Sequence, residues 1–259
     1  MLVGYAVLVP WVAGVDERVT DFAAARQGPS LAHPFGTDSA GRDLFVRTAA
    51  GLRVSLLVAA VCAVLSTVLG AVVGAVSGAV GGRVDRAVMR LVDAVNAVPH
   101  LLLGIVLVAL FRGSLVAIIA SIALTHWTQV ARIVRAEVLS LRDREHVDAA
   151  VLGGATRWYV VRRHLLPAAL PQALVAAVLL LPHAVWHEST LSFLGLGLPP
   201  HRASLGTLLE EARSSLLLGG WWVLVFPALG LVLATLAVAG VGSALRDRVA
   251  LPRRVEVDL

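Results

Sequence analysis

The sequence predicts an all-α, polytopic membrane protein, on the basis of its composition and its long apolar stretches. Hydrophobic residues make up 58% of the 259 residues and charged residues only 15%, and the mean hydropathy is +0.83. A soluble globular protein carries roughly 25% charged residues. This chain has too little polar material to coat a water-exposed surface, and the same composition excludes a disordered chain and a disulfide scaffold.

Six apolar stretches are candidate membrane spans, since a helix needs about 20 apolar residues to cross the hydrocarbon core. They lie at residues 1–15, 54–80, 94–111, 114–130, 170–191 and 221–245. The first stretch is short, and a cleaved signal peptide is its alternative interpretation, although no basic residue precedes the apolar run. We expect the whole chain, residues 1–259, to form a single transmembrane domain.

The placement of arginine predicts the orientation of these spans. All 22 basic residues are arginines, and 14 of them follow the second, fourth and sixth spans. The positive-inside rule therefore places both termini and residues 131–169 in the cytoplasm and residues 16–53 outside. The net charge of +5 follows from this topology and requires no nucleic-acid partner. Tryptophans near span ends are expected to be interfacial anchors: Trp11, Trp127, Trp186, Trp221 and Trp222.

A ridge of small residues marks the second predicted span. It recurs at every fourth position, as Cys62, Ser66, Gly70, Gly74 and Gly78. Small residues allow the close backbone approach through which helices associate in lipid. The ridge predicts a tight helix contact, either within the bundle or with another subunit, rather than mere richness in alanine and glycine. The single cysteine, Cys62, excludes an intrachain disulfide.

The segment between the fourth and fifth spans predicts a compact cytoplasmic knob. Residues 145–171 read EHVDAAVLGGATRWYVVRRHLLPAALP. Asp148 is an acid at the start of a short helix, and Gly153 and Gly154 permit the left-handed backbone that ends it. Thr156 is a candidate N-cap for a second helix, which we expect to break at Pro167. A basic amphipathic helix beside the membrane is the alternative.

The knob resembles the EAA loop of bacterial ABC importer permeases. The resemblance rests on Asp148-Ala149-Ala150, on Gly154 six residues after Asp148, and on Leu166-Pro167, with Asp148 where the family usually has Glu. In that family the knob is the coupling helix, which docks in a cleft of the cytoplasmic ATPase subunit. The resemblance implies an ATPase-coupling role for Asp148, Ala149, Ala150, Gly154, Arg157, Leu166 and Pro167.

Two further blocks resemble the C-type permeases of dipeptide, oligopeptide and nickel importers. One block is HPFGTD at residues 33–38 followed by GRD at 41–43, and the other is ESTLSFLGLGLPP at 188–200. The motif residues of the first block are Gly36, Thr37, Asp38, Gly41, Arg42, Asp43 and Arg47. Its alternating charges and turn glycines predict an internally paired cap. A docking contact for an extracytoplasmic binding protein is the other hypothesis, and the two are compatible.

Ionisable groups in the fifth predicted span are candidate pathway residues, because charge inside a membrane is costly. The candidates are His183, His187, Glu188 and Ser192. His183 and His187 share a helix face at i, i+4, a spacing that suits nickel or zinc. Two histidines and one carboxylate make an incomplete metal shell, so we expect polar lining or hydrogen bonding between helices instead, and no metal.

The resemblance covers His33 to Arg248 and implies the type I ABC importer permease fold, with six transmembrane helices and a cytoplasmic coupling helix. It implies a permease subunit of an ATP-driven importer for di- and oligopeptides in the bacterial cytoplasmic membrane, forming half of the translocation pathway. A nickel or other small-solute importer is the alternative. The implied partners are a homologous B-type permease subunit, two cytoplasmic ABC ATPase subunits, an extracytoplasmic solute-binding protein and membrane lipid.

Two other classes are less consistent with the sequence. The chain lacks G-x-x-x-x-G-K-[ST], so we expect no ATPase site and no cofactor in it, with ATP and Mg bound by the partner subunits. An intramembrane hydrolase would need Ser189 beside His187, but residues at i, i+2 face different ways on a helix. A secondary transporter is expected to show paired repeats with broken helices, which the sequence lacks.

Overall fold

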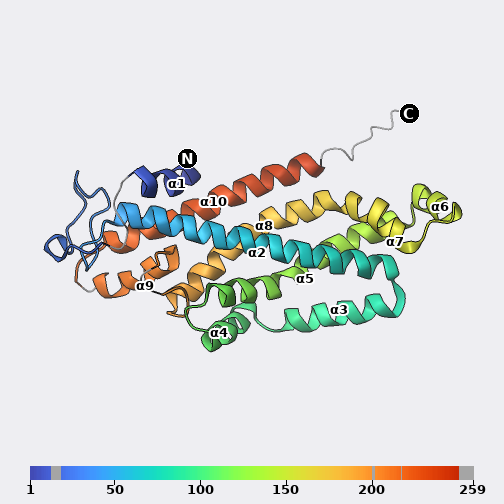
Figure 1. The fold of residues 1–259 in the computed structure, drawn as a ribbon, viewed down its shortest axis with the longest axis horizontal. Coiled ribbons are helices and arrows are strands. Elements are labelled where there is room, and N and C mark those ends of the chain that lie inside the picture. Colours follow the sequence, from blue (N-terminus) through green and yellow to red (C-terminus); the bar gives the residue numbers. More distant parts are fainter. Residues whose placement is uncertain (13–18, 200–201, 217, 251–259) are drawn as a thin grey trace. The chain divides into compact units, whose positions relative to one another are not determined.

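The structure is a computed structural model that describes residues 1–12, 19–199, 202–216 and 218–250, and of residues 157, 249 and 250 only the backbone. This part of the chain is almost entirely helical, with one isolated β-bridge between Thr37 and Asp43 (Figure 1). The helices are α1 (Leu2–Val12), η1 (Phe22–Ala24), α2 (Leu44–Val80), α3 (Gly82–Ala97), α4 (His100–Leu110), α5 (Leu115–Arg142), α6 (Glu145–Leu152), α7 (Arg157–Val160), the π-helix η2 (Val161–Leu165), α8 (Leu166–Phe193), α9 (Leu205–Leu216) and α10 (Trp222–Ala250).

Four helices in the described part of the chain are long and apolar enough to cross a membrane: Leu44–Val80, Leu115–Arg142, Trp158–Phe193 and Trp222–Arg248. A fifth candidate is the pair α3 and α4, which is bent by 80°. The bend lies at Val98, whose φ of −85° and ψ of 128° are the extended values favoured before a proline. The described part of the chain therefore supports four or five of the six predicted spans. The first, predicted at residues 1–15, corresponds to the 11-residue helix α1, and residues 13–15 lie outside the described part.

The helices build two compact units. Unit 1 contains Met1–Val61, Gly104–Ser121 and Pro182–Ala237, and unit 2 contains Cys62–Leu103, Ile122–Leu181 and Val238–Leu259. Both units bury apolar side chains in cores of their own.

Unit 1 is organised around α9, which packs closely on two other helices. A Cβ added at Gly51 of α2 would lie 3.1 Å from the backbone of Ser204, and one added at Gly206 of α9 would lie 2.5 Å from the carbonyl oxygen of Ser189 on α8. The short helix α1 joins this core through Ala6, which is buried. Tyr5 of α1 also donates a hydrogen bond from its hydroxyl to the Phe45 carbonyl, at 2.8 Å.

Unit 2 contains the small-residue ridge, which faces α5 of the same chain. A Cβ at Gly70 would lie 2.5 Å from the Trp127 carbonyl oxygen, and Gly74 is equally close to the Ala131 backbone. A later residue of α2 contacts a later residue of α5, so the two helices run parallel here. The ridge is thus an intrachain contact. Trp127 is buried against it at 8% exposure, so the prediction that Trp127 is an interfacial anchor was wrong.

Helix α3 lies antiparallel to α5 through polar contacts. The Arg135 Nη2 donates to Asp85 Oδ2 at 2.6 Å, and Ser77 Oγ of α2 donates to Asp85 Oδ1 at 2.6 Å. Further along, Thr128 Oγ1 donates to Asn96 Oδ1 at 2.8 Å. The Asp85 carboxylate of α3 therefore accepts hydrogen bonds from both α5 and α2.

Candidate functional site

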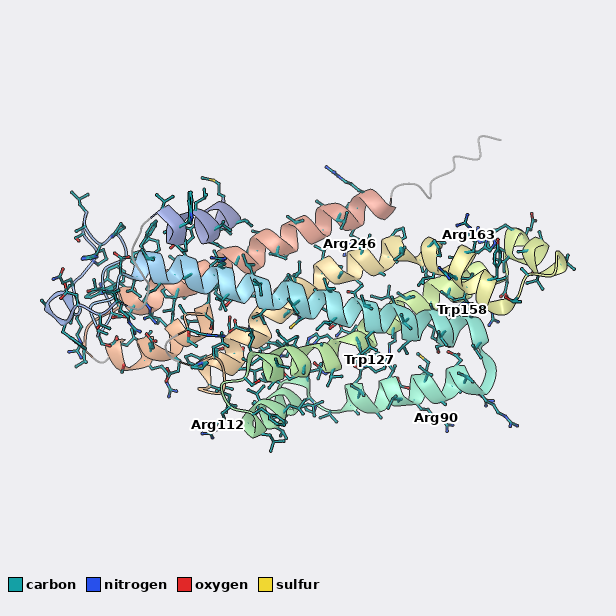
Figure 2. All side chains as sticks on the ribbon, viewed as in Figure 1. Arg90, Arg112, Trp127, Trp158, Arg163 and Arg246 are labelled. Carbon is teal, nitrogen blue, oxygen red and sulfur yellow. The ribbon has the colours of Figure 1, made fainter. Side chains whose placement is uncertain are left out.

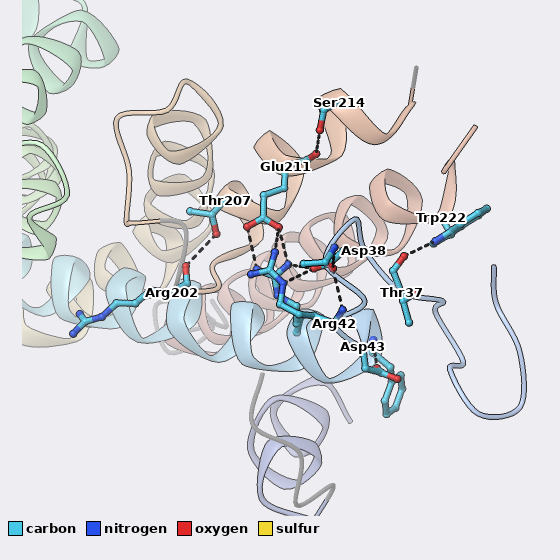
Figure 3. Close-up of polar contacts among 12 residues, drawn as sticks. Thr37, Asp38, Arg42, Asp43, Arg202, Thr207, Glu211, Ser214 and Trp222 are labelled. Carbon is cyan, nitrogen blue, oxygen red and sulfur yellow. Dashed lines mark hydrogen bonds and ion pairs between the residues drawn. The ribbon is translucent and has the colours of Figure 1, made fainter. Parts of the chain in front are cut away.

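The charged motif before α2 forms a closed set of ion pairs in unit 1 (Figure 3). Arg47, only 2% exposed, donates from Nη1 to Asp38 Oδ2 at 2.6 Å and to Glu211 Oε2 at 2.6 Å. Arg42 donates from Nε to Asp38 at 2.7 Å and from Nη2 to Glu211 at 3.0 Å. Two positive and two negative groups therefore neutralise one another. We call Asp38, Arg42, Arg47 and Glu211 the α2–α9 ion cluster.

Tight turns hold the motif in this conformation. Gly36 and Gly41 adopt φ of 73° and 75°, a region that favours glycine, and a Cβ at Gly41 would overlap the Asp21 carbonyl. Asp38 Oδ1 accepts hydrogen bonds from two backbone amides within the turn, those of Ala40 and Arg42. The structure thus shows the predicted turn glycines and pairs Asp38 with Arg42 and Arg47, and the role of this segment as a cap stays a prediction.

The remaining motif residues tie the turn to the neighbouring helices. Asp43 Oδ1 accepts from the Phe45 and Val46 amides at the first turn of α2, at 2.8 and 3.1 Å, and its other oxygen lies 2.7 Å from His33 Nδ1. Thr37 Oγ1 donates to the Ala24 carbonyl, and the Thr37 carbonyl accepts from Trp222 Nε1 at 3.1 Å.

Glu211 is the member of the ion cluster that the sequence motif did not include. It lies 164 residues after Arg47, and no local pattern links the two. The only available signal was the acidic pair Glu210–Glu211 in a segment otherwise poor in charge. The structure thus adds a residue of α9 to a motif that had been assigned to the segment before α2.

The buried carboxylate Glu188 forms a second polar centre in unit 1. It is 0% exposed and accepts hydrogen bonds from Ser55 Oγ at 2.7 Å and from Ser192 Oγ at 2.8 Å. Ser55 Oγ also accepts from the Leu205 amide at 3.2 Å, so the group joins α2, α8 and α9. Hydroxyl donors satisfy both carboxylate oxygens, as a buried acceptor requires.

The two histidines of α8 are less buried than this centre. The side chain of His183 is exposed, and the partly buried His187 contacts the Trp186 ring edge-on at 5.3 Å between centroids. Among the described residues there is no group of three or more His, Cys, Asp or Glu that could hold a metal ion. Of the four candidate pathway residues, the structure brings together Glu188 and Ser192.

The knob of unit 2 consists of α6, a glycine turn, α7 and the π-helix η2. The Ala155 amide donates to the Ala150 carbonyl at 3.0 Å, and Gly154 adopts φ of 87°, which is the arrangement of a glycine-terminated helix. Thr156 Oγ1 accepts from the Tyr159 amide at 3.2 Å and caps α7, as predicted. Helix α6 begins at Glu145, so Asp148 lies in its first turn.

The expected break at Pro167 does not occur. The π-helix η2 precedes it, and the Leu166 amide donates to the Val161 carbonyl five residues earlier. Helical structure then continues through Pro167 to Phe193. In a π turn an amide bonds to the carbonyl five residues earlier instead of four. This shift in the backbone hydrogen-bond pattern falls just where proline lacks an N–H, so the helix continues past Pro167. Pro167 is exposed and Leu166 is half-buried.

The knob has two contrasting faces. Its inner face buries Val147, Val160 and Leu165 in the same apolar cluster as residues of α5 and α8. Its outer face exposes Leu152 by 88%, Trp158 by 66% and Tyr159 by 52%. Figure 2 labels Trp158 and Arg163 in this region. A shallow hollow of about 580 Å³ on this side is lined by Thr156, Trp158, Tyr159, Arg162 and Arg163.

The predicted coupling residues divide between these faces. Asp148 and Ala149 are exposed, Ala150 is half-buried, and Gly154 is exposed, with no atom within 4 Å of the point where a Cβ would lie. The side chain of Arg157 lies outside the described part of the structure. The knob therefore presents an apolar and basic surface on an anchored base, which is suited to binding another protein.

The fold belongs to a known class of membrane protein. It matches a subunit of the MetNI methionine ABC transporter in inward-facing conformations, with a TM-score of 0.63 and 21% identity over 77% of this chain and 94% of the other. It also matches a chain of an amino acid ABC transporter solved with histidines, with a TM-score of 0.59 and 17% identity over 78% and 94% of the two chains. The fold is that of type I ABC importer permeases.

Sequence relatives identify the family. The profile of the binding-protein-dependent transport system inner membrane component matches residues 70–251. The oligopeptide transport system permease protein OppC of Escherichia coli (strain K12) is 41% identical over 245 residues, 94% of this chain and 81% of that protein. The dipeptide transport system permease protein DppC of Bacillus subtilis (strain 168) is 39% identical over 219 residues, 85% and 68% of the two chains.

The chain therefore belongs to the family of binding-protein-dependent transport system inner membrane components. It is a multi-pass protein of the bacterial inner membrane and an ABC transporter permease.

Proposed function

We propose that this chain is the permease subunit of an ATP-driven importer for di- and oligopeptides. The relatives named as oligopeptide and dipeptide permeases support this substrate class. In this proposal a homologous B-type permease forms the other half of the pathway, and an extracytoplasmic solute-binding protein delivers the peptide. Two cytoplasmic ATPase subunits bind ATP and Mg, and this chain contributes no ATPase site of its own.

The two-faced knob is the observation that carries the coupling role. Its outer face exposes Leu152, Trp158 and Tyr159, which would be unfavourable in water unless a partner covers them. The neighbouring Arg162 and Arg163 add positive charge at the edge of that surface. Such a centre of aromatic and aliphatic residues with arginines beside it is typical of protein interfaces. The partner that we assign to it is an ATPase subunit.

The buried inner face of the knob would transmit motion of the ATPase to the membrane helices. Val147, Val160 and Leu165 share one apolar core with α5 and α8, so the knob is packed onto these helices rather than tethered to them. Movement of the docked ATPase would therefore displace the bases of α5 and α8 together. In the proposed cycle this displacement switches the permease pair between outward- and inward-facing states, as rigid-body motion about an interface. We place both termini in the cytoplasm and the α2–α9 ion cluster outside.

The candidate pathway residues receive different roles in this proposal. Ser55 and Ser192 occupy both oxygens of Glu188, so we assign that carboxylate to hydrogen bonding between helices. His183 and His187 are more accessible and are the side chains that we assign to the polar lining.

A pair of leucine variants tests the docking role. Leu152→Asp places a charge on the outer face of the knob, and the matched control Leu31→Asp changes a fully exposed leucine in unit 1. Both variants should fold, since neither side chain is buried. We expect Leu152→Asp to abolish co-purification of the ATPase subunits and ATP-dependent uptake, whereas Leu31→Asp keeps the ATPases. Normal ATPase retention in Leu152→Asp would overturn the coupling assignment.

The substrate class needs a separate measurement. The complete transporter, reconstituted in proteoliposomes with its binding protein, should accumulate a labelled dipeptide or oligopeptide only when ATP is present inside with the ATPases. Uptake of nickel but not of peptide would overturn the substrate assignment and leave the coupling role intact. Uptake by this chain without ATPases would overturn both.

A further inference from the structure

A pocket in unit 1 combines two arginines with an apolar wall. Its volume is about 330 Å³, and it is lined by Arg53, Val54, Leu57, Val58, Leu115, Leu198, Arg202 and Ala203. Arg53 and Val54 mark the start of the predicted second span, so the charged end of the pocket lies where the apolar stretch begins. The apolar lining comes from the first turns of that span, from Leu115 of α5, and from Leu198 and Ala203 between α8 and α9.

Arg53 and Arg202 are both exposed, and among the residues that the structure describes neither guanidinium has an ion-pair or hydrogen-bond partner. Arg42 and Arg47, in the same unit, are both held by carboxylates. Figure 3 shows the Arg202 side chain extending away from the α2–α9 ion cluster. A charge at the boundary of an apolar span requires a counter-charge or water, and two like charges that line one pocket favour an anionic ligand there.

We propose that this pocket binds the phosphate of an anionic phospholipid, held by Arg53 and Arg202, with an acyl chain along Val54, Leu57 and Leu115. Guanidinium binds phosphate through paired hydrogen bonds, and a charge-assisted hydrogen bond to phosphate is about twice as strong as a neutral one. The apolar wall matches a hydrocarbon chain and offers nothing to a free inorganic anion.

The residues that line the pocket favour an anionic phospholipid over a peptide. Every unmodified peptide carries an α-ammonium as well as a carboxylate, and the described lining contains no Asp or Glu to receive a positive group. The same argument disfavours zwitterionic lipids, whose headgroup carries an amine. A net negative headgroup is the chemistry that two unpaired arginines complement.

The test uses the full transporter complex, purified in detergent and stripped of lipid. Binding of phosphatidylglycerol is measured by native mass spectrometry and by its concentration-dependent thermal stabilisation. Arg53→Gln/Arg202→Gln removes the two pocket charges. The control Arg26→Gln/Arg112→Gln removes two exposed charges of the same unit, and Arg112 is labelled in Figure 2. The pocket variant should weaken binding about ten-fold or more, with the control unchanged.

Further ligands and variants distinguish a lipid site from a simple anion site and from a substrate site. Arg53→Lys/Arg202→Lys should keep part of the affinity, since it keeps the charge and loses the paired hydrogen bonds. Equal phosphatidylglycerol binding in all variants would overturn the proposal, as would equal binding of phosphatidylcholine. Competition by inorganic phosphate alone would show an anion site without a lipid. Competition by a free peptide but not by its C-terminal amide would assign the pocket to substrate instead. If the double variant fails to fold, the single variants are measured in its place.

Discussion

The two units of this permease differ internally, most clearly in how much charge each of them buries. Unit 1 buries charge, in the α2–α9 ion cluster and at Glu188. Unit 2 relies on close backbone packing, with glycines of α2 against α5, and on an apolar cluster that includes the base of the knob. Buried polar groups depend on direction and on every partner being present, whereas apolar packing depends on volume. The units should therefore respond differently to substitution.

The largest effect is expected from Arg47→Gln in unit 1. It leaves Asp38 and Glu211 facing each other with only Arg42 between them, and removing one partner of a buried ion group costs about 3–5 kcal/mol. The measurement is the melting temperature of the purified protein, monitored as the loss of its monodisperse peak on heating. Arg112→Gln removes an exposed arginine from the same unit and should have no effect. Equal melting of the two variants would show that the cluster contributes nothing.

A smaller effect is expected from Gly70→Ala in unit 2. The new Cβ would lie 2.5 Å from the Trp127 carbonyl oxygen and 2.6 Å from Val130 Cβ, so α2 and α5 must separate, at a cost of about 1–3 kcal/mol. Gly240→Ala is the matched control, since Gly240 is also helical and has nothing within 4 Å. It should be neutral or stabilising, because alanine favours helix. A stable Gly70→Ala would contradict the close approach of the two helices.

Asp85 is the polar exception in unit 2, and replacing it should have a moderate effect. The residue is 9% exposed, and its carboxylate accepts from Arg135 Nη2 and from Ser77 Oγ, both at 2.6 Å. Asp85→Asn removes the charge that pairs with Arg135, so the free energy of unfolding should fall by about 1 kcal/mol. Denaturant unfolding of the variant and of the wild type measures the change. Equal stability of the two would exclude a contribution from this pairing.

The smallest effect is expected from Glu188→Gln. The amide keeps one acceptor oxygen, and the hydroxyls of Ser55 and Ser192 can rotate to serve the new donor, so the cost should stay below about 1 kcal/mol. Glu188→Leu removes both acceptors and should cost more. Thermal unfolding and peptide uptake are measured together. Normal stability with lost uptake in Glu188→Gln would assign the charge itself to transport, in place of the structural role proposed above.

The sequence predicted those features that depend on neighbours along the chain. The helical class, the turn at Gly154 and the Thr156 cap follow from local rules of helix termination, and the family followed from three motifs. Partners that are distant in sequence were missed, as Glu211 and the contact of Asp85 with Arg135 show. The predicted break at Pro167 was wrong because the π-helix η2 changes the backbone hydrogen-bond pattern where proline lacks an N–H. No residue pattern in the sequence predicts this change.

The separation of 164 residues between Arg47 and Glu211 also limits when their ion pair can form during synthesis of the protein. When α2 leaves the ribosome, Asp38 is already present nine residues away, but Glu211 has not been synthesised. The second carboxylate arrives only with α9, after α8 has been added to the chain. Unit 1 thus cannot complete its charge neutralisation during the early steps of insertion. Its long-range pairing must form late, and until then Arg47 depends on Asp38 and water.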